Sequence, residues 1–505
     1  MPSIDIPTHD GILRGIDNAG VMSFLGVPYG QATGGENRFR GPQPVQPWEG
    51  VREALAFGPA APQVDTRSHA AANGPRVLSM LYPRAGWPVE AGPMSEDCLR
   101  LDVWAPSGRL DDALPVLVWL HGGGFTHGSG NEMAFNGDVL AQAGELVVVT
   151  VTHRLGITGF LDLRDDGLPE SADAGMLDIV AALEWVQRNI RSFGGDPSRV
   201  TVSGQSGGSA KVAALHGMPA ADGLFAGAIM MSGPFTTAMS RDHARAVRDT
   251  AVGILGASDV EELRSLPLER LLDAQAQILA RQAGRFGSAP TEAAFGFGPA
   301  VDETHLPEQP FARAVTARPL MIGWTTHEAG LLLADAPEYD VDLTGPDVVA
   351  LIDQDAPGQG ATIYADLERR HPAEPAHLRW SRWLSTRVMA EPAVALADRL
   401  RRRGGAVWAY EFAQTTEVLG GLLGACHSLD LAYVFGTVDR IPLTGRDPRR
   451  IDVSRDMMRA WASFCHDGDP GWTMWNGADD VQVFGAVTSV DDVDLTQTVR
   501  ALPIG

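Results

Sequence analysis

The chain has 505 residues, 44% of them hydrophobic and 20% charged, a composition typical of a globular protein with a large core. Its net charge of −23 gives no attraction to a phosphate backbone, so we expect no nucleic-acid partner. The N-terminus lacks a secretory signal, and the apolar runs at 114–120 and 145–151 are too short to span a bilayer. With only three cysteines, these features predict a cytoplasmic protein that has no membrane partner.

Short apolar and β-branched runs predict six strands, at 115–120, 146–151, 200–203, 227–231, 319–323 and 406–411. Because these runs are apolar throughout, they indicate a sheet that is buried on both faces. Segment 172–191 places apolar residues at helical spacing between the second and third of these strands. That order predicts a strand–helix–strand crossover and a parallel sheet, so the fold class is α/β.

The middle of the chain is richer in Ala, Arg, Leu and Glu, at about 240–310 and 335–400. We interpret these two segments as helical insertions or a cap region. The sequence shows no internal repeat and no long linker. We therefore predict one elaborated α/β domain over residues 1–505.

A glycine cluster follows the first of these strands, in LPVLVWLHGGGFTHGSG at 114–130. Three consecutive glycines leave backbone N–H groups exposed, and an oxyanion hole needs such donors. A turn without any ligand is the alternative interpretation of this cluster.

A second cluster, VTVSGQSGGS at 200–209, places Ser206 in the pattern Gly-x-Ser-x-Gly between a strand and a helix-compatible run. This is the setting of a nucleophile elbow, where glycines prevent collisions in a tight turn and the helix N-terminus faces the serine. The alternative is a Gly-rich turn or phosphate loop, which the absence of the Gly-Lys-Ser/Thr ending of a P-loop disfavours.

Taken in order, these blocks resemble the type B carboxylesterases, a family of bacterial esterases and animal cholinesterases. The resemblance runs nearly from end to end, through FLGVPYG (24–30), NRFRGPQPVQPWEGVREALAFGPAAPQ (37–63), SEDCLRLDVWAP (95–106), LVWLHGGGF (117–125), THRLGITGFL (152–161), WVQRNIRSFGGDPSRVTVSGQSGGS (185–209), MMSG (230–233) and HSLDLAYVFG (427–436). It implies the α/β-hydrolase fold, with a mostly parallel central sheet and helices on both faces.

The resemblance also implies a catalytic triad and an oxyanion hole. Ser206 matches the nucleophile, Glu328 in GWTTHEAG matches the acid, and His427 in GACHSLDLAYVFG matches the base. The matching oxyanion donors are the N–H groups of Gly123, Gly124 and Gly207. From the residues alone, Glu328 could be a solvated loop carboxylate, and we assign its neighbour His327 a structural role. The chemistry needs no metal or organic cofactor.

Three positions depart from or extend the family pattern. Many secreted members pair the cysteine at the position of Cys98 with a second cysteine at the position that is Ala61 here, so we expect Cys98 to be a free buried thiol. Gln205 stands where cholinesterases place glutamate before the nucleophile, and an amide attracts a cationic substrate less than a carboxylate does. We interpret Trp87 as a surface loop aromatic.

The expected substrate is therefore a small neutral ester with apolar or aromatic parts. Candidate pocket residues are Phe125, Gln205, Phe295, Phe297 and Leu331, although apolar residues are more often core.

Two further matches concern packing around the site. Ser232 matches a serine near the active site, and a strand-end hydroxyl is an equal alternative for it. Arg38 and Glu96 match a family salt bridge.

The sequence thus predicts a serine hydrolase that cleaves carboxylic esters through an acyl-enzyme, as a monomer or homodimer. A carbamate or anilide hydrolase that acts on xenobiotics with the same triad is the second hypothesis. The third is a non-catalytic binding domain of the cholinesterase type, which the presence of all three triad residues disfavours.

Overall fold

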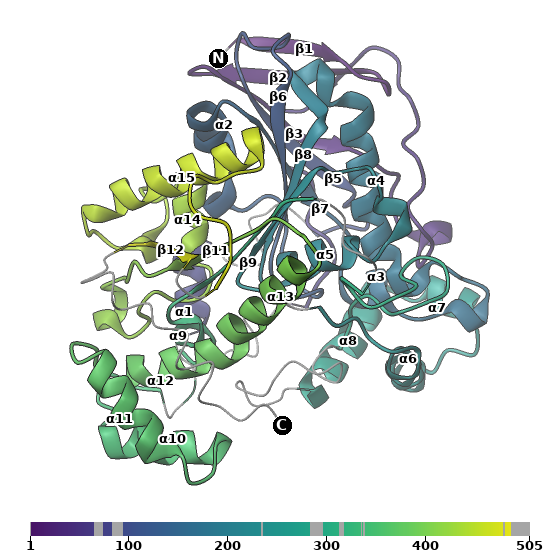
Figure 1. Ribbon diagram of the computed structural model, residues 1–505. Coiled ribbons are helices and arrows are strands. Elements are labelled where there is room, and N and C mark those ends of the chain that lie inside the picture. Colours follow the sequence, from purple (N-terminus) through teal and green to yellow (C-terminus); the bar gives the residue numbers. More distant parts are fainter. Residues whose placement is uncertain are drawn as a thin grey trace.

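A mixed sheet forms the centre of the molecule in the computed structural model (Figure 1). The structure describes residues 2–64, 74–82, 94–233, 236–282, 296–312, 318–334, 336, 339–477 and 480–485. Within these residues the sheet has twelve strands, in the order β1-β2-β3-β5-β7-β6-β8-β9-β10-β11-β12, and β4 pairs with β2. The strands are β1 (Ser3–Pro7), β2 (Ile12–Asn18), β3 (Val21–Pro28), β4 (Val51–Glu53), β5 (Arg100–Pro106), β6 (Leu114–Leu120), β7 (Val147–Thr152), β8 (Gly195–Gln205), β9 (Gly227–Met231), β10 (Leu320–Thr325), β11 (Val407–Phe412) and β12 (Val481–Phe484).

Across the sheet from β7 through β6 to β12, each pair of neighbouring strands is parallel. The main N-terminal path from β1 through β2, β3 and β5 to β7 is antiparallel. The six predicted strands correspond to β6 through β11, so their existence and the parallel sheet are confirmed. Strand β8 begins several residues earlier than predicted, because Asp196, Pro197 and Ser198 hide its start behind turn-forming residues.

Helices cover both faces of the sheet. They are α1 (Gly74–Leu81), α2 (Asp138–Gly144), α3 (Gly156–Phe160), α4 (Ala174–Asn189), α5 (Gly207–Leu215), α6 (Arg241–Leu255), α7 (Val260–Ser265), α8 (Leu268–Gln282), α9 (Glu328–Leu332), α10 (Gly345–Asp355), α11 (Gly360–Arg370), α12 (Ala376–Ser385), α13 (Glu391–Arg402), α14 (Asp430–Val434) and α15 (Arg449–Asp467).

Strand β6 shows how the two faces are built. Val116, Val118 and Leu120 pack into a core cluster that includes side chains of α4, α5, α8 and α13. Leu117 and Trp119, between them along the strand, pack into a second cluster with side chains of α2, α14 and α15. Because successive strand residues point to opposite faces, the apolar run makes a sheet buried on both sides.

The segments expected to be helical insertions contain α6 to α8 and α10 to α13. Helices α10 to α12 pack with α9 around a small core of their own, which contains Val348, Ile352, Trp380 and Trp383. The assignment of residues 1–505 to one domain stays a prediction.

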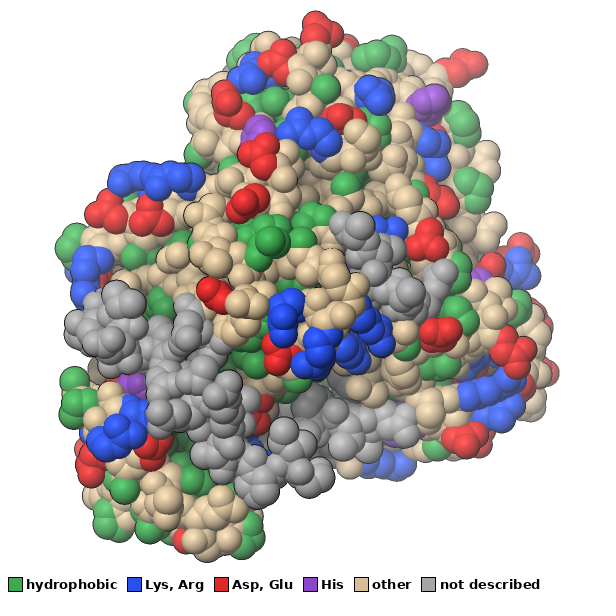
Figure 2. Space-filling model, in the orientation of Figure 1, with side chains coloured by type: hydrophobic (Ala, Val, Ile, Leu, Met, Phe, Trp, Pro, Cys, Tyr) green, Lys and Arg blue, Asp and Glu red, His purple; other side chains and the backbone are tan. Residues whose placement is uncertain are grey.

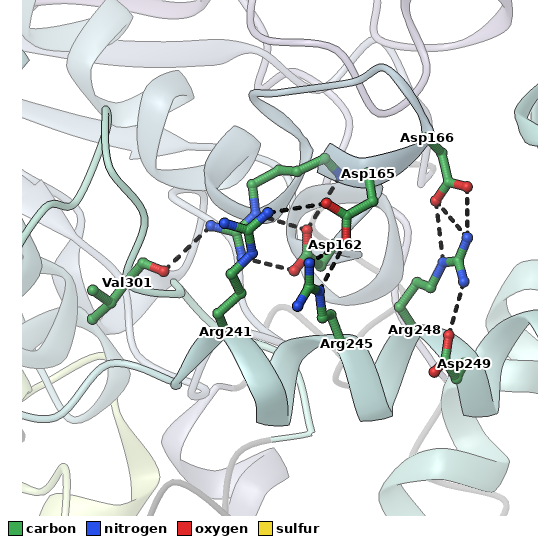
Figure 3. Close-up of polar contacts among 9 residues, drawn as sticks. Asp162, Asp165, Asp166, Arg241, Arg245, Arg248, Asp249 and Val301 are labelled. Carbon is green, nitrogen blue, oxygen red and sulfur yellow. Dashed lines mark hydrogen bonds and ion pairs between the residues drawn. The ribbon is translucent and has the colours of Figure 1, made fainter.

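Helix α6 is held to the segment after α3 by ion pairs (Figure 3). Arg245 contacts Asp165 at 2.7 Å, and Arg248 contacts Asp166 at 2.6 Å. Arg241 also contacts Asp165, at 3.0 Å. These side chains are partly exposed, so each pair contributes about 0.2–1 kcal/mol.

Acidic and basic side chains are interspersed over the face shown in Figure 2. Among the helices that the structure describes, none has the length and apolar character needed to cross a membrane.

Candidate active site

The backbone at Ser206 has the strained geometry of a nucleophile elbow. Its φ is 56° and its ψ is −122°, in the region that side chains rarely adopt. Close packing of the neighbouring backbone holds Ser206 in this conformation. A Cβ added at Gly204 would overlap the backbone of Gly208, and one at Gly208 would overlap Leu120 O. The amide of Ser206 also donates to Met231 O at 2.9 Å. The two flanking glycines are therefore required by contact between backbone segments.

The two glycine clusters of the sequence meet at this elbow. A Cβ added at Gly207 would overlap the backbone N, Cα and O of Gly124. Gly123 and Gly124 have φ values of 85° and 64°, which turn the loop after β6 toward α5. Within the described part of the chain, the amides of Gly123, Gly124 and Gly207 donate to no protein acceptor. Three free N–H groups next to Ser206 could bind an oxyanion.

Glu328 and His427 are joined although they lie far apart in the sequence. His427 Nδ1 lies 2.5 Å from Glu328 Oε2. Glu328 is fully buried at the start of α9, and its Oε1 accepts the amide of Thr325 at 2.7 Å. With Nδ1 donating to the carboxylate, Nε2 of His427 carries the free lone pair that a general base needs. The described residues include no hydrogen-bond partner of Ser206 Oγ.

Gln205 contacts the ring of His427. Its Nε2 lies 3.1 Å from His427 Nε2 and 3.5 Å from His427 Nδ1. A donor aligned with the in-plane lone pair of Nε2 would be much farther from Nδ1, because the outward directions of the two nitrogens diverge in the ring plane. The amide therefore lies over the ring face and leaves that lone pair open. Gln205, predicted as a pocket residue, is 1% exposed in the structure.

A second buried carboxyl group lies beside Glu328 and His427. Burial and the neighbouring charge of Glu328 raise the pKa of Asp430, and His427 lowers it in part, so that it lies at about 7. Tyr410 Oη donates to Asp430 Oδ2 at 3.4 Å. Burial also raises the pKa of the Cys426 thiol, so that this neighbour of His427 stays neutral. Near neutral pH, Asp430 therefore carries only part of a negative charge beside the pair.

His327 connects the turn that carries Glu328 to the loop that carries His427. Its backbone N–H donates to Ala425 O at 2.9 Å, and the Ala425 N–H donates back to His327 Nδ1 at 3.0 Å. Its Nε2 lies 3.3 Å from Glu374 Oε1. Burial would raise the pKa of Glu374, but His327 and Arg382 hold it well below its usual range. The structural role predicted for His327 is thus a link between the segments that carry Glu328 and His427.

A buried basic group that the sequence did not predict lies behind the glycine loop. Lys211, on α5, is fully buried, and its Nζ donates to His121 O at 2.9 Å. The rings of His121 and His153 stack with their centres 4.9 Å apart. Burial, together with the charge of Lys211, lowers the pKa of both histidines far below its usual value, so both are neutral. A lone lysine among small apolar residues in GGSAKVAAL was the available signal.

The remaining pocket candidates lie in different places. Phe125 and Phe297 are buried in the same core cluster, whereas Leu331 on α9 packs against the cluster of the other face. Phe295 and Trp87 lie outside the described residues. Ser232 follows β9 beside the elbow with a φ of 46°, and its buried Oγ has no partner among the described residues.

The structure confirms the predicted salt bridge and the predicted free thiol. Arg38 binds Glu96 through two hydrogen bonds, of 2.8 and 2.7 Å. Cys98 is a buried free thiol. The described ranges contain no group of three His, Cys, Asp or Glu side chains placed to hold a metal ion.

Comparison with known proteins gives consistent matches over the chain. The model of the carboxylesterase family matches residues 2–485. Para-nitrobenzyl esterase of Bacillus subtilis is 34% identical, covering 92% of this chain and 90% of the relative. Phenmedipham hydrolase of Pseudarthrobacter oxydans is 33% identical with the same coverage. A solved esterase of Clostridium hathewayi, described as able to hydrolyse aliphatic aromatic polyesters, superposes with a TM-score of 0.80 at 30% identity, over 99% of this chain and 98% of that one.

Proposed function

The chain belongs to the carboxylesterase family, has the α/β-hydrolase fold and hydrolyses carboxylic esters, and from this premise we propose which residues carry the reaction and which esters they accept. Ser206 is the nucleophile, His427 the general base and Glu328 the acid that orients it. The amides of Gly123, Gly124 and Gly207 form the oxyanion hole.

The observation that carries this proposal is the 2.5 Å contact between His427 Nδ1 and Glu328 Oε2. Gln205, the residue before the strained Ser206, contacts the same imidazole and so places Ser206 near the pair. A buried carboxylate fixes the tautomer of the ring and stabilises the imidazolium that forms when the base takes a proton. The hydrogen bond between nucleophile and base often forms only with bound substrate, so its absence among the described contacts is compatible with this role.

Acylation begins when Ser206 Oγ attacks the ester carbonyl carbon while its proton passes to His427 Nε2. The carbonyl oxygen becomes an oxyanion, and the three amides stabilise it. The intermediate then collapses: the bond to the alcohol oxygen breaks, and that oxygen takes the proton from His427. This leaves the acyl group on Ser206.

Deacylation repeats these steps with water. His427 removes a proton from the water molecule as its oxygen attacks the acyl carbon. The bond to Ser206 Oγ breaks, Ser206 recovers its proton from His427, and the carboxylic acid leaves. Glu328 keeps its charge throughout.

The substrates proposed are neutral short-chain or aromatic esters. Gln205 supports this, because its neutral amide lies beside the base at a position where a carboxylate would favour a cationic substrate. The second candidate is hydrolysis of carbamates or anilides by the same triad. One observation favours testing it: a relative at 33% identity is named for the hydrolysis of phenmedipham.

We place the enzyme in the cytoplasm, as a monomer or homodimer. Its three cysteines support this location, because all are buried free thiols, which a reducing compartment preserves.

The test is hydrolysis of p-nitrophenyl esters from acetate to octanoate by the wild type and Ser206→Ala, with phenmedipham and a p-nitroanilide in parallel. We expect turnover of short neutral esters by the wild type, and a loss on the order of 10⁶ in kcat for the variant. Faster turnover of choline esters than of matched neutral esters would contradict the substrate class. Equal activity of both proteins would contradict the assignment of Ser206.

A further inference from the structure

Lys211 is the only lysine in the chain, since every other member of the 40 Lys and Arg residues is arginine. It lies on α5, the helix that begins directly after Ser206, and it is fully buried. Burying an amine is costly unless its N–H groups are used. Arginine stays charged when it is buried, whereas lysine can give up its proton.

The amine faces the loop that follows β6. Lys211 Nζ donates to the carbonyl oxygen of His121 at 2.9 Å and lies 5.6 Å from the ring centre of Phe125. His121 and Phe125 directly flank the three glycines of that loop. Both ends of the glycine segment thus contact the same side chain.

The other groups near the amine are neutral or basic. The stacked rings of His121 and His153 are kept neutral by burial and by Lys211, and Arg154 lies close enough to lower the pKa of His153 further. No carboxylate of the described ranges is within ion-pair distance of Nζ. Burial lowers the pKa of Lys211 to about 7, so its charge changes near neutral pH.

This arrangement joins the two halves of the oxyanion hole. Gly207 belongs to α5, which also carries Lys211, whereas Gly123 and Gly124 belong to the loop that Lys211 holds. The halves are already in contact, because Gly207 has no room for a Cβ beside Gly124. A hydrogen bond from α5 to His121 O keeps the loop against the helix at that contact.

We propose that Lys211 is a positioning residue of the oxyanion hole, whose amine holds the glycine loop against α5 and, when protonated, places a positive charge behind the amides that receive the oxyanion. This rests on the proposed function, which assigns those amides. A buried charge near a developing oxyanion acts strongly, because few water molecules screen it.

The test compares an ester with its thionoester in Lys211→Met, which keeps the length and apolar stem of the side chain. Sulfur in place of the carbonyl oxygen is a poor ligand for an oxyanion hole, so the thionoester depends little on its geometry. We expect kcat for the p-nitrophenyl ester to fall by about 10- to 100-fold, less than the ~10²–10³-fold loss of a whole donor. KM and thionoester turnover should stay close to the wild type.

Val212→Ala is the matched control, because Val212 is the next residue of α5, is equally buried and packs into the core beneath the sheet. It should lower stability without changing the ratio of ester to thionoester turnover. Equal losses of kcat on the ester and the thionoester in Lys211→Met would mean that Lys211 has a packing role only. No loss of kcat on the ester would mean that Lys211 has no role in the oxyanion hole. Either result overturns the proposal. If Ser206→Ala retained activity, the proposed function would be wrong, and this inference with it.

A second measurement needs no variant. Lysine labelled with ¹³C at the ε-carbon gives one signal in the wild type, because the chain has one lysine. A trifluoromethyl ketone adds to the active serine and leaves an oxyanion in the hole. We expect the lysine signal to shift when the ketone binds, and to titrate at a higher pH in the complex. A signal that the bound ketone leaves unchanged would overturn the proposal.

Discussion

Exchange of His327 for asparagine or glutamine separates its two contacts. Asparagine places an amide oxygen close to the position of Nδ1, so it can still accept the Ala425 N–H that His327 accepts at 3.0 Å. Glutamine reaches one bond farther, toward Glu374, whose Oε1 lies 3.3 Å from Nε2. The first substitution therefore keeps the link to the loop of His427, and the second keeps the link to Glu374.

The two losses have different magnitudes. Without an acceptor, the buried amide of Ala425 costs about 1–3 kcal/mol of unfolding free energy. Glu374 keeps its partner Arg382 and is partly exposed, so the lost contact with His327 costs about 0–1 kcal/mol. We expect His327→Gln to be less stable than His327→Asn by about 1–2 kcal/mol. Its kcat should also be lower, by up to about 10²-fold, because a shift of about 1 Å in the base can cost that much.

The assay is urea unfolding followed by tryptophan fluorescence, together with kcat and KM for p-nitrophenyl acetate. His9→Asn is the control, because His9 is an exposed histidine in the turn between β1 and β2. Equal stability and equal kcat in the two His327 variants, or a more damaged asparagine variant, would refute the reasoning.

Four other substitutions test the packing and the buried charges. Folding lowers the pKa of Lys211 from 10.5 to about 7, so Lys211→Met should be more stable than the wild type at pH 6, by up to about 5 kcal/mol at ~1.36 kcal/mol per pH unit. This advantage of the variant should shrink as the pH rises from 7 toward 10.5, where the folded wild type holds a neutral lysine. An advantage that does not change with pH would count against a charged Lys211. Burial raises the pKa of Asp102 from 3.8 to about 7, so its contribution to stability is present below pH 3.8 and is lost as the pH rises through 7; relative to Asp102→Asn, the wild type should lose stability between pH 4 and 8 in urea unfolding, and parallel curves would contradict this. Gly208→Ala, whose Cβ would overlap Leu120 O, should lower stability by about 1–3 kcal/mol or more and abolish ester turnover, since backbone on both sides prevents relief. Gly253→Ala, where nothing lies within 4 Å, should raise the melting temperature slightly, and similar effects of the two alanines would be inconsistent with the packing seen at the elbow.

The parallel half of the sheet was predictable because its strands carry their own signal. LPVLVWL in β6 is apolar at every position, as a strand buried on both faces must be. The antiparallel half was not predicted. Strand β2, ILRGIDN, contains glycine and charged residues, and β3 is interrupted by an irregularity between Phe24 and Val27. Strands with such interrupted patterns are specified by their partners more than by their own sequence.

The candidate site also has a part that was predictable from local sequence and a part that was not. The elbow at Ser206 is a local feature, because adjacent residues make a strand, a turn and a helix, so a short motif identifies it. The pair of Glu328 and His427 joins residues far apart in the chain, and only the family resemblance indicated it. Neither the contact of Lys211 with His121 nor that of His327 with Glu374 follows a local pattern. Contacts of this kind depend on how the loops pack, which one sequence does not reveal.

In the proposed mechanism, Ser206 carries the acyl group during turnover. The most direct test is to quench the enzyme with acid while it hydrolyses p-nitrophenyl acetate, and to locate any acetyl group by peptide mass spectrometry. The account predicts one acetyl group, on Ser206, in the wild type and none on the corresponding peptide of Ser206→Ala. An acetyl group on another residue, or acetylation that persists in an active Ser206→Ala variant, would contradict it.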